Sequence, residues 1–164
     1  MGTYRPKKCR RCYRPLYRCN CAYQPRSHEQ YLDSDKLRSN LGANGHGGEA
    51  HHIIPGNIVE EKKWVDKKIA AKDFFNEAWN GIMLNGTRSP RRFYIINRLS
   101  VNKYNLSILH RKGGQRSHSK YDNRVRALID KMNIKNRFDC EFAAHEIKNK
   151  IMFNNADSLD DLMF

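Results

Sequence analysis

The chain has 164 residues, with 31 Lys and Arg against 17 Asp and Glu, a formal net charge of +14 and a pI near 9.8. Its length and its hydrophobic fraction of 39% suit one domain with a modest core. No apolar run is long enough to span a bilayer, and the first residues lead into cysteines and charge, so we expect neither a membrane segment nor a signal peptide. The charge predicts a polyanion, nucleic acid above all, as the partner.

The N-terminal segment is rich in cysteine. Four of the five cysteines fall within 13 residues: Cys9, Cys12, Cys19 and Cys21. Four thiolates this close favour a tetrahedral structural Zn²⁺, and the absence of an export signal argues against disulfides. We therefore predict a small zinc-binding module at residues 1–26. Cys140 stands apart and is predicted to be a small buried residue in a helix.

Residues 27–155 predict one mainly helical α+β domain. A capping-box pattern begins a helix over 27–41, which ends before a glycine. A short strand through His51-His52 follows, and then a helix over 57–71, because an asparagine can cap it. Residues 79–84 predict a second strand.

The second half of the domain begins with a long basic segment. Residues 85–117 show no regular period and are predicted to form an irregular loop, which in a compact domain is usually functional or mobile. From Ser117 onward, apolar residues recur at three- and four-residue steps to Met132, which predicts an amphipathic helix. A last helix is predicted over 139–153, with Phe142 on its apolar face. The acidic residues 156–164 are predicted to be a flexible tail.

The pair His51-His52 indicates chemistry. Consecutive side chains of a strand point to opposite faces, so one imidazole can bind a metal ion while its neighbour takes a proton from water. Neutral imidazole suits both tasks, because it is a common metal ligand and its ordinary pKa lies near neutral pH. In isolation, two surface histidines are the simpler interpretation, so the decision rests on the other motifs.

Those motifs resemble a known family when they are taken in order. A strand with His51-His52, a strand with Asn80, a basic loop and a helix beginning near His118 follow the order of a ββα-metal finger. The sequence is similar to the AHH nucleases of the HNH/endonuclease VII superfamily, which occur mostly as bacterial toxin domains. The similarity runs over about residues 37–151 and rests on four motifs: Leu37-Arg38-Ser39-Asn40-Leu41, Glu49-Ala50-His51-His52-Ile53-Ile54-Pro55, Ala78-Trp79-Asn80-Gly81-Ile82-Met83-Leu84, and His110 with His118-Ser119-Lys120-Tyr121-Asp122. It implies an HNH-like finger surrounded by helices and a metal-dependent nuclease.

The resemblance also implies roles for single residues. The ligands of a divalent ion, Mg²⁺, Mn²⁺ or Zn²⁺, are expected on the first strand and the helix: His51, His118 and Asp122. For Asp122 alone, an acid that offsets the helix dipole is the simpler interpretation. His52 is expected to be the general base, and Asn80 to orient that base or brace the finger loop. His110 is expected to contact the phosphate or to be a further ligand.

The basic loop completes the functional prediction. Its cations outnumber any nearby acid, which favours phosphate contact, and six basic residues are predicted to bind nucleic acid: Arg88, Arg91, Arg92, Arg111, Lys112 and Arg116. We therefore expect an endonuclease that hydrolyses DNA, acting as a toxin or effector that an acidic immunity protein neutralises. It would be cytoplasmic in its producer and reach a target cell's cytoplasm without a signal peptide.

Two alternatives stay open at this point. An RNase on the same scaffold is chemically close, because metal-assisted hydrolysis needs no 2′-hydroxyl. A non-catalytic, zinc-stapled module that binds nucleic acid is also consistent with the charge. It leaves the order of the histidines and Asn80 unexplained.

Overall fold

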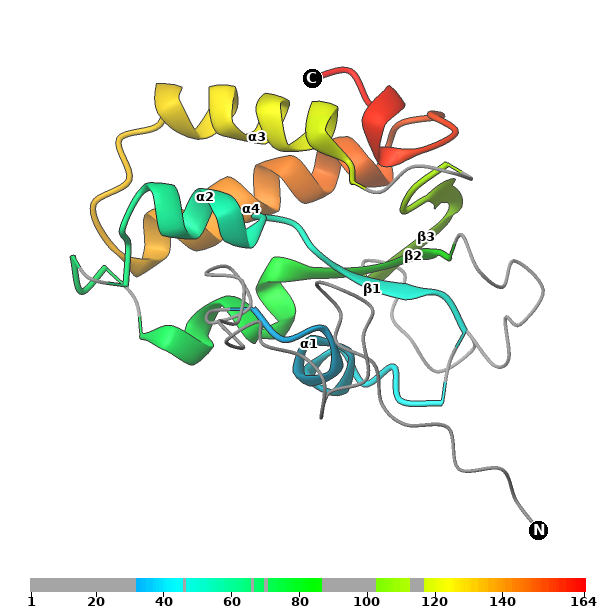
Figure 1. The fold of residues 1–164 in the computed structure, drawn as a ribbon, viewed down its shortest axis with the longest axis horizontal. Coiled ribbons are helices and arrows are strands. Elements are labelled where there is room, and N and C mark those ends of the chain that lie inside the picture. The colour runs from blue at the N-terminus through cyan, green and yellow to red at the C-terminus, as the bar shows by residue number, and fades with distance from the viewer. Residues whose placement is uncertain (1–31, 46, 66, 70, 87–102, 113–116) are drawn as a thin grey trace, which may run out of the picture.

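The computed structural model describes residues 32–45, 47–65, 67–69, 71–86, 103–112 and 117–164 (Figure 1). They form a mixed α/β domain with four α-helices: α1 (Ser34–Asn40), α2 (Gly56–Glu61), α3 (Ser119–Lys131) and α4 (Arg137–Met152). The strands are β1 (Glu49–His52), β2 (Gly81–Asn85) and β3 (Tyr104–Leu109), and the short 3-10 helices are η3 (Lys72–Asn76), η4 (Ala78–Asn80) and η7 (Leu159–Asp161). None of the helices in these ranges is long and apolar enough to cross a membrane. The predicted zinc module at residues 1–26 lies outside the described residues.

The three strands form one small sheet in the order β1-β2-β3. β1 and β2 are antiparallel, with His51 opposite Ile82 and Ala50 opposite Met83, whereas β2 and β3 are parallel. Because side chains alternate across a strand, His51 and Ile82 share one face, and Ala50 and Met83 share the other. Figure 1 shows α3 and α4 on one side of this sheet and α1 on the other.

Each face of the sheet has its own apolar cluster. On the α1 side, Leu37 and Leu41 pack with Ala50 and Met83. On the other side, the larger cluster joins Ile82 of β2 to residues of α2, α3 and α4. The sheet is therefore held from both sides, and β1 carries one histidine into each environment.

Helix α3 confirms the amphipathic helix predicted from Ser117 onward, since Tyr121, Val125 and Ile129 are buried along one face. Cys140 is buried in α4, as predicted. The capping residue of α4 is Asn136, which forms a capping box with Asp139. The period of apolar residues was therefore sufficient to locate both long helices.

Two other helices differ from the prediction. The first begins at Ser34, where the Asp33 side chain accepts hydrogen bonds from the backbone N–H groups of Asp35 and Lys36. The predicted helix over 57–71 ends at Glu61. After this helix the chain turns at Lys63, which has a positive φ. The turn lets the Trp64 ring stack on the Phe75 ring, with ring centroids 5.9 Å apart.

Three further predictions were wrong. Strand β3 lies inside the segment predicted to be irregular, and Phe142 is 60% exposed rather than part of the core. Residues 156–164 were predicted to be flexible, yet Leu159 and Leu162 are fully buried. Asp160 accepts a hydrogen bond from the Tyr121 backbone N–H, which ties this segment to the start of α3.

Candidate metal and catalytic site

Three histidines from three elements meet on the α3 side of the sheet. His51 comes from β1, His110 directly follows β3, and His118 is the N-cap residue of α3. Their ring centroids lie 4.9 Å (His51 to His110), 5.1 Å (His51 to His118) and 5.0 Å (His110 to His118) apart. One ring nitrogen from each lies within 4.8 Å of the others. These distances suit three imidazole nitrogens that share one metal ion.

The electrostatics of His51 fit a cation there. The side chain is 3% exposed, and among the described residues its Nε2 is buried without a hydrogen-bond partner. Burial holds the pKa of His51 well below its ordinary value, and the neighbouring His110 and His118 lower it further. A neutral imidazole with a buried, unused lone pair is what a metal ion requires from a ligand.

The other two histidines are held by carboxylates. His110 Nδ1 lies 2.5 Å from Glu49 Oε2, and His118 Nδ1 lies 2.8 Å from Asp122 Oδ1. Burial lowers the pKa of His110, although the Glu49 hydrogen bond opposes that shift. Asp122, predicted to be an oxygen ligand, contacts a histidine of the cluster instead, and the candidate metal group consists of imidazoles alone. His110, predicted to contact phosphate or ligate, lies within this group.

His52 lies on the opposite face from this cluster. It is 7% exposed, and its Nε2 is 3.0 Å from Asn76 Oδ1. The same oxygen accepts the backbone N–H of Asp33 at 2.7 Å, so the Asn76 atom is an acceptor and His52 Nε2 must carry the hydrogen. The lone pair is therefore on Nδ1 of the neutral ring. Burial lowers the pKa of His52 to about 4, so the ring is neutral at pH 7.

Asn80 braces the chain that follows β1. It is fully buried, its Oδ1 accepts the Ile54 backbone N–H at 2.7 Å, and its Nδ2 donates to the Phe75 carbonyl at 3.0 Å. Tyr121 adds a second tie, because its hydroxyl donates to the Ile53 carbonyl at 2.6 Å. Both contacts fix the chain just beyond the two adjacent histidines.

Of the predicted nucleic-acid contacts, two lie among the described residues, directly after His110 in the sequence. Arg111 follows His110, with its Nη2 3.8 Å from Glu49 Oε2, and Lys112 pairs with Asp161 at 2.9 Å. The others lie outside the described residues: Arg88, Arg91, Arg92 and Arg116. The four predicted zinc ligands also lie outside them: Cys9, Cys12, Cys19 and Cys21.

Sequence reasoning assigned no role in the site to Glu49, Asn57 or Asn76. Glu49 did have a signal, because it stands two residues before His51 and so shares its face of the strand. Asn57 donates to Asp122 Oδ2 at 3.1 Å and was interpreted as a helix cap. Asn76 has no motif around it that would have identified it.

Comparison with known proteins identifies a family. No curated protein and no solved structure gives a significant match. A protein-family profile matches residues 32–158, and it is described as a nuclease family of the HNH/ENDO VII superfamily with conserved AHH. The tripeptide is present as Ala50-His51-His52, so that its two histidines are the pair that β1 sends to opposite faces. The chain therefore belongs to the AHH nuclease family of the HNH/ENDO VII superfamily.

Proposed function

We propose that the chain is a metal-dependent endonuclease that hydrolyses phosphodiester bonds of DNA, with β1, β2 and α3 as its ββα-metal finger. The observation that carries this proposal is the cluster of His51, His110 and His118, in which the buried Nε2 of His51 has no hydrogen-bond partner within the described part of the chain. Without a bound cation that nitrogen would be desolvated and unsatisfied, which is costly.

The donor set favours one class of metal ion. Imidazole suits Zn²⁺ and its transition-metal neighbours, whereas Mg²⁺ prefers carboxylate and water oxygens. Within the candidate group each donor is an imidazole nitrogen. We therefore propose that Zn²⁺ or a similar transition metal is the resident ion, ahead of Mn²⁺ and Mg²⁺.

The protein's own residues supply the remaining chemistry. A divalent ion, when bound, polarises the scissile phosphate and stabilises the leaving oxygen. His52 takes the proton of the attacking water on Nδ1, the ring nitrogen that its bond to Asn76 leaves unprotonated. Asn80 holds the backbone after β1 so that His51 and His52 keep their positions. Arg111, next to His110, contacts the substrate phosphate.

The biological setting is part of the proposal. A net charge of +14 favours a nucleic-acid substrate, of which we propose DNA, and an acidic immunity protein as inhibitor. We propose a toxin or effector that is held inactive in its producer's cytoplasm and acts in the cytoplasm of a target cell. A structural Zn²⁺ at the four N-terminal cysteines stays a prediction from their spacing.

The test is a cleavage assay with purified protein that has been stripped of metal. Supercoiled plasmid and a transcribed RNA are each incubated with Zn²⁺, Co²⁺, Mn²⁺, Mg²⁺ or chelator, beside a His145→Ala control on the outer face of α4. We expect DNA cleavage that depends on metal and is strongest with transition metals. Cleavage of RNA alone would assign an RNase, and no cleavage of either substrate by folded, metal-loaded protein would refute the proposal.

A further inference from the structure

We propose that Glu49 and Asp122 are positioning residues that aim the Nε2 atoms of His110 and His118 at the metal ion and offset its charge. This inference rests on the proposed metal centre. Neither side chain needs to touch the ion or the substrate, because each acts through the histidine that it contacts. It gives Asp122 a different role from the oxygen ligand that the sequence predicts.

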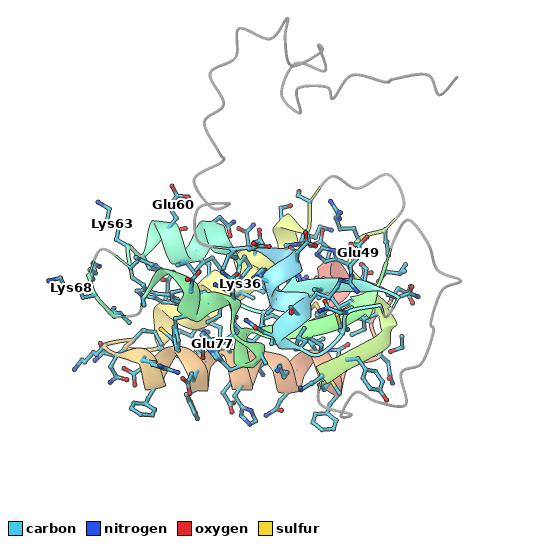
Figure 2. The ribbon with its side chains drawn as sticks, turned by 90° about the horizontal axis from the view of Figure 1, so that it is seen from below. Lys36, Glu49, Glu60, Lys63, Lys68 and Glu77 are labelled. Carbon is cyan, nitrogen blue, oxygen red and sulfur yellow. The ribbon has the colours of Figure 1, made fainter. Side chains whose placement is uncertain are left out.

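The surroundings of Glu49 are shaped for this contact. Glu49 and His51 are two residues apart on β1, so both point to the side of the sheet that faces α3. A Cβ on Gly86 would lie 3.1 Å from Glu49 Cγ, so a larger residue there would crowd the Glu49 side chain. Figure 2 shows Glu49 at the end of the molecule opposite to Lys63 and Lys68. Because residue 86 is a glycine, there is room for the Glu49 carboxylate beside His110.

Asp122 is held more tightly, because both of its oxygens have partners. Oδ1 contacts His118 Nδ1 one helical turn earlier, and Oδ2 accepts from Asn57 Nδ2 of α2 at 3.1 Å. This bond joins α2 to α3 across 65 positions of sequence. The orientation of the His118 ring is thus set from two helices.

Two consequences follow from these contacts. A carboxylate accepts the Nδ1 hydrogen of its histidine, so the lone pair of the neutral ring lies on Nε2 and is available to a metal. The two carboxylates also bring negative charge next to the three imidazoles, which offsets the charge of a divalent ion in a largely buried place. His51 has no carboxylate partner of this kind among the described residues.

The test measures metal affinity rather than cleavage. Zn²⁺ binding to the full chain is followed by competition with a chromophoric chelator, for wild type, Glu49→Gln, Glu49→Leu and Asp122→Asn. Glu49→Gln keeps an acceptor and loses the charge, so we expect about a tenfold loss of affinity, and Glu49→Leu loses both, so we expect a loss nearer 100-fold. Asp122→Asn should fall in the same range. The predicted zinc site at the N-terminal cysteines is the same in all these proteins, so a difference in Zn²⁺ affinity between them reports on the histidine site.

Matched controls remove a carboxylate of the same kind elsewhere. Glu61→Gln and Asp130→Asn break ion pairs with Arg126 and Lys62, and both should bind Zn²⁺ like wild type. A purely structural role would lower the thermal stability of the metal-free variants and leave the affinity of the folded protein unchanged. Wild-type affinity in both Glu49→Leu and Asp122→Asn would overturn the inference. If wild type binds Zn²⁺ and the variants lose it, but no protein cuts nucleic acid, only the proposed function fails.

Discussion

At the scale of single residues, the neutral ring of His52 is held in one tautomer by a contact that lies 24 positions away in sequence. The Asp33 backbone N–H identifies the Asn76 atom as an acceptor, so the proton on Nε2 follows from the hydrogen bonds rather than from an assumption. The two histidines of β1 thus differ in what each can do. His51 has a buried ring nitrogen without a hydrogen-bond partner among the described residues, in a cluster of three histidines, whereas His52 has its lone pair on Nδ1.

The first prediction concerns His52. His52→Ala removes the proposed base and no group of the His51, His110 and His118 cluster, so single-turnover cleavage should slow on the order of 10²–10⁴-fold. Zn²⁺ affinity should stay at the wild-type value. His145→Ala, an exposed histidine of α4, is the control and should cleave normally. A folded His52→Ala protein that cleaves like wild type would remove this residue from the mechanism.

The second prediction concerns Asn80. Asn80→Ala leaves the Ile54 N–H and the Phe75 carbonyl without their side-chain partner in a fully buried place. The free energy of unfolding should therefore fall by about 2–4 kcal/mol, measured by urea unfolding of the metal-free protein. Asn155→Ala, at an exposed position, should change it by less than about 0.5 kcal/mol. An equal, small effect of both substitutions would contradict the bracing role.

At the scale of elements, the sequence predicted β1, β2, α3 and α4 because each has a strong local signal. It missed β3, whose six residues are stabilised by parallel pairing with β2 rather than by any local pattern. Its position in a segment dense in arginine and lysine favoured a loop. It also overextended the helix after β1, because the burial of Trp64 against Phe75 overrides the local preference for helix.

The third prediction concerns Lys148, a lysine of α4. Burial, with a smaller contribution from Lys103, lowers the pKa of Lys148 from 10.5 to about 8. The unfolded chain therefore binds more protons than the folded one between pH 8 and 10.5, and Lys148 makes stability rise with pH across that window. At pH 7 the folded protein bears the full free-energy cost of burying the charged Lys148 side chain. Lys148→Met should therefore stabilise the protein by up to about 3 kcal/mol.

The measurement is urea unfolding of wild type and Lys148→Met at pH 7 and pH 10. The stability gained by the variant should shrink toward pH 10, since wild-type Lys148 is then largely neutral in the folded state. Lys131→Met, an exposed lysine of α3, serves as the control. A gain that is the same at both pH values would mean that Lys148 acts through packing and not through its charge.

At the scale of the whole molecule, the sequence predicted the histidines and Asn80 of the candidate site. It did not predict the residues that hold those side chains in place. The histidines and Asn80 stand in motifs whose order is visible in the sequence. Glu49, Asn57 and Asn76 act through partners 61, 65 and 24 positions away, and no local pattern reports such contacts. They become visible only when the sheet and α3 bring these segments together.

The fourth prediction concerns how the affinity for DNA depends on salt concentration. If the basic segment from Arg88 to Arg116 neutralises about five phosphates, the affinity of cleavage-deficient His52→Ala for duplex DNA should fall with a log–log salt slope of about −4 to −5. The measurement is fluorescence anisotropy over a series of salt concentrations. A slope shallower than about −2 would show that this segment does not follow the DNA backbone.

The central claim is that one metal ion, held by His51, His110 and His118, makes the chain a nuclease. The most direct test is the plasmid cleavage rate of chelator-stripped protein as Zn²⁺ or Co²⁺ is added back, for wild type, His51→Ala and the less buried His118→Ala. Stripped wild type should be silent and recover with added metal, whereas both variants should be folded and stay silent over the same range. Full cleavage by stripped wild type, or recovery of both variants at the wild-type metal concentration, would contradict the claim.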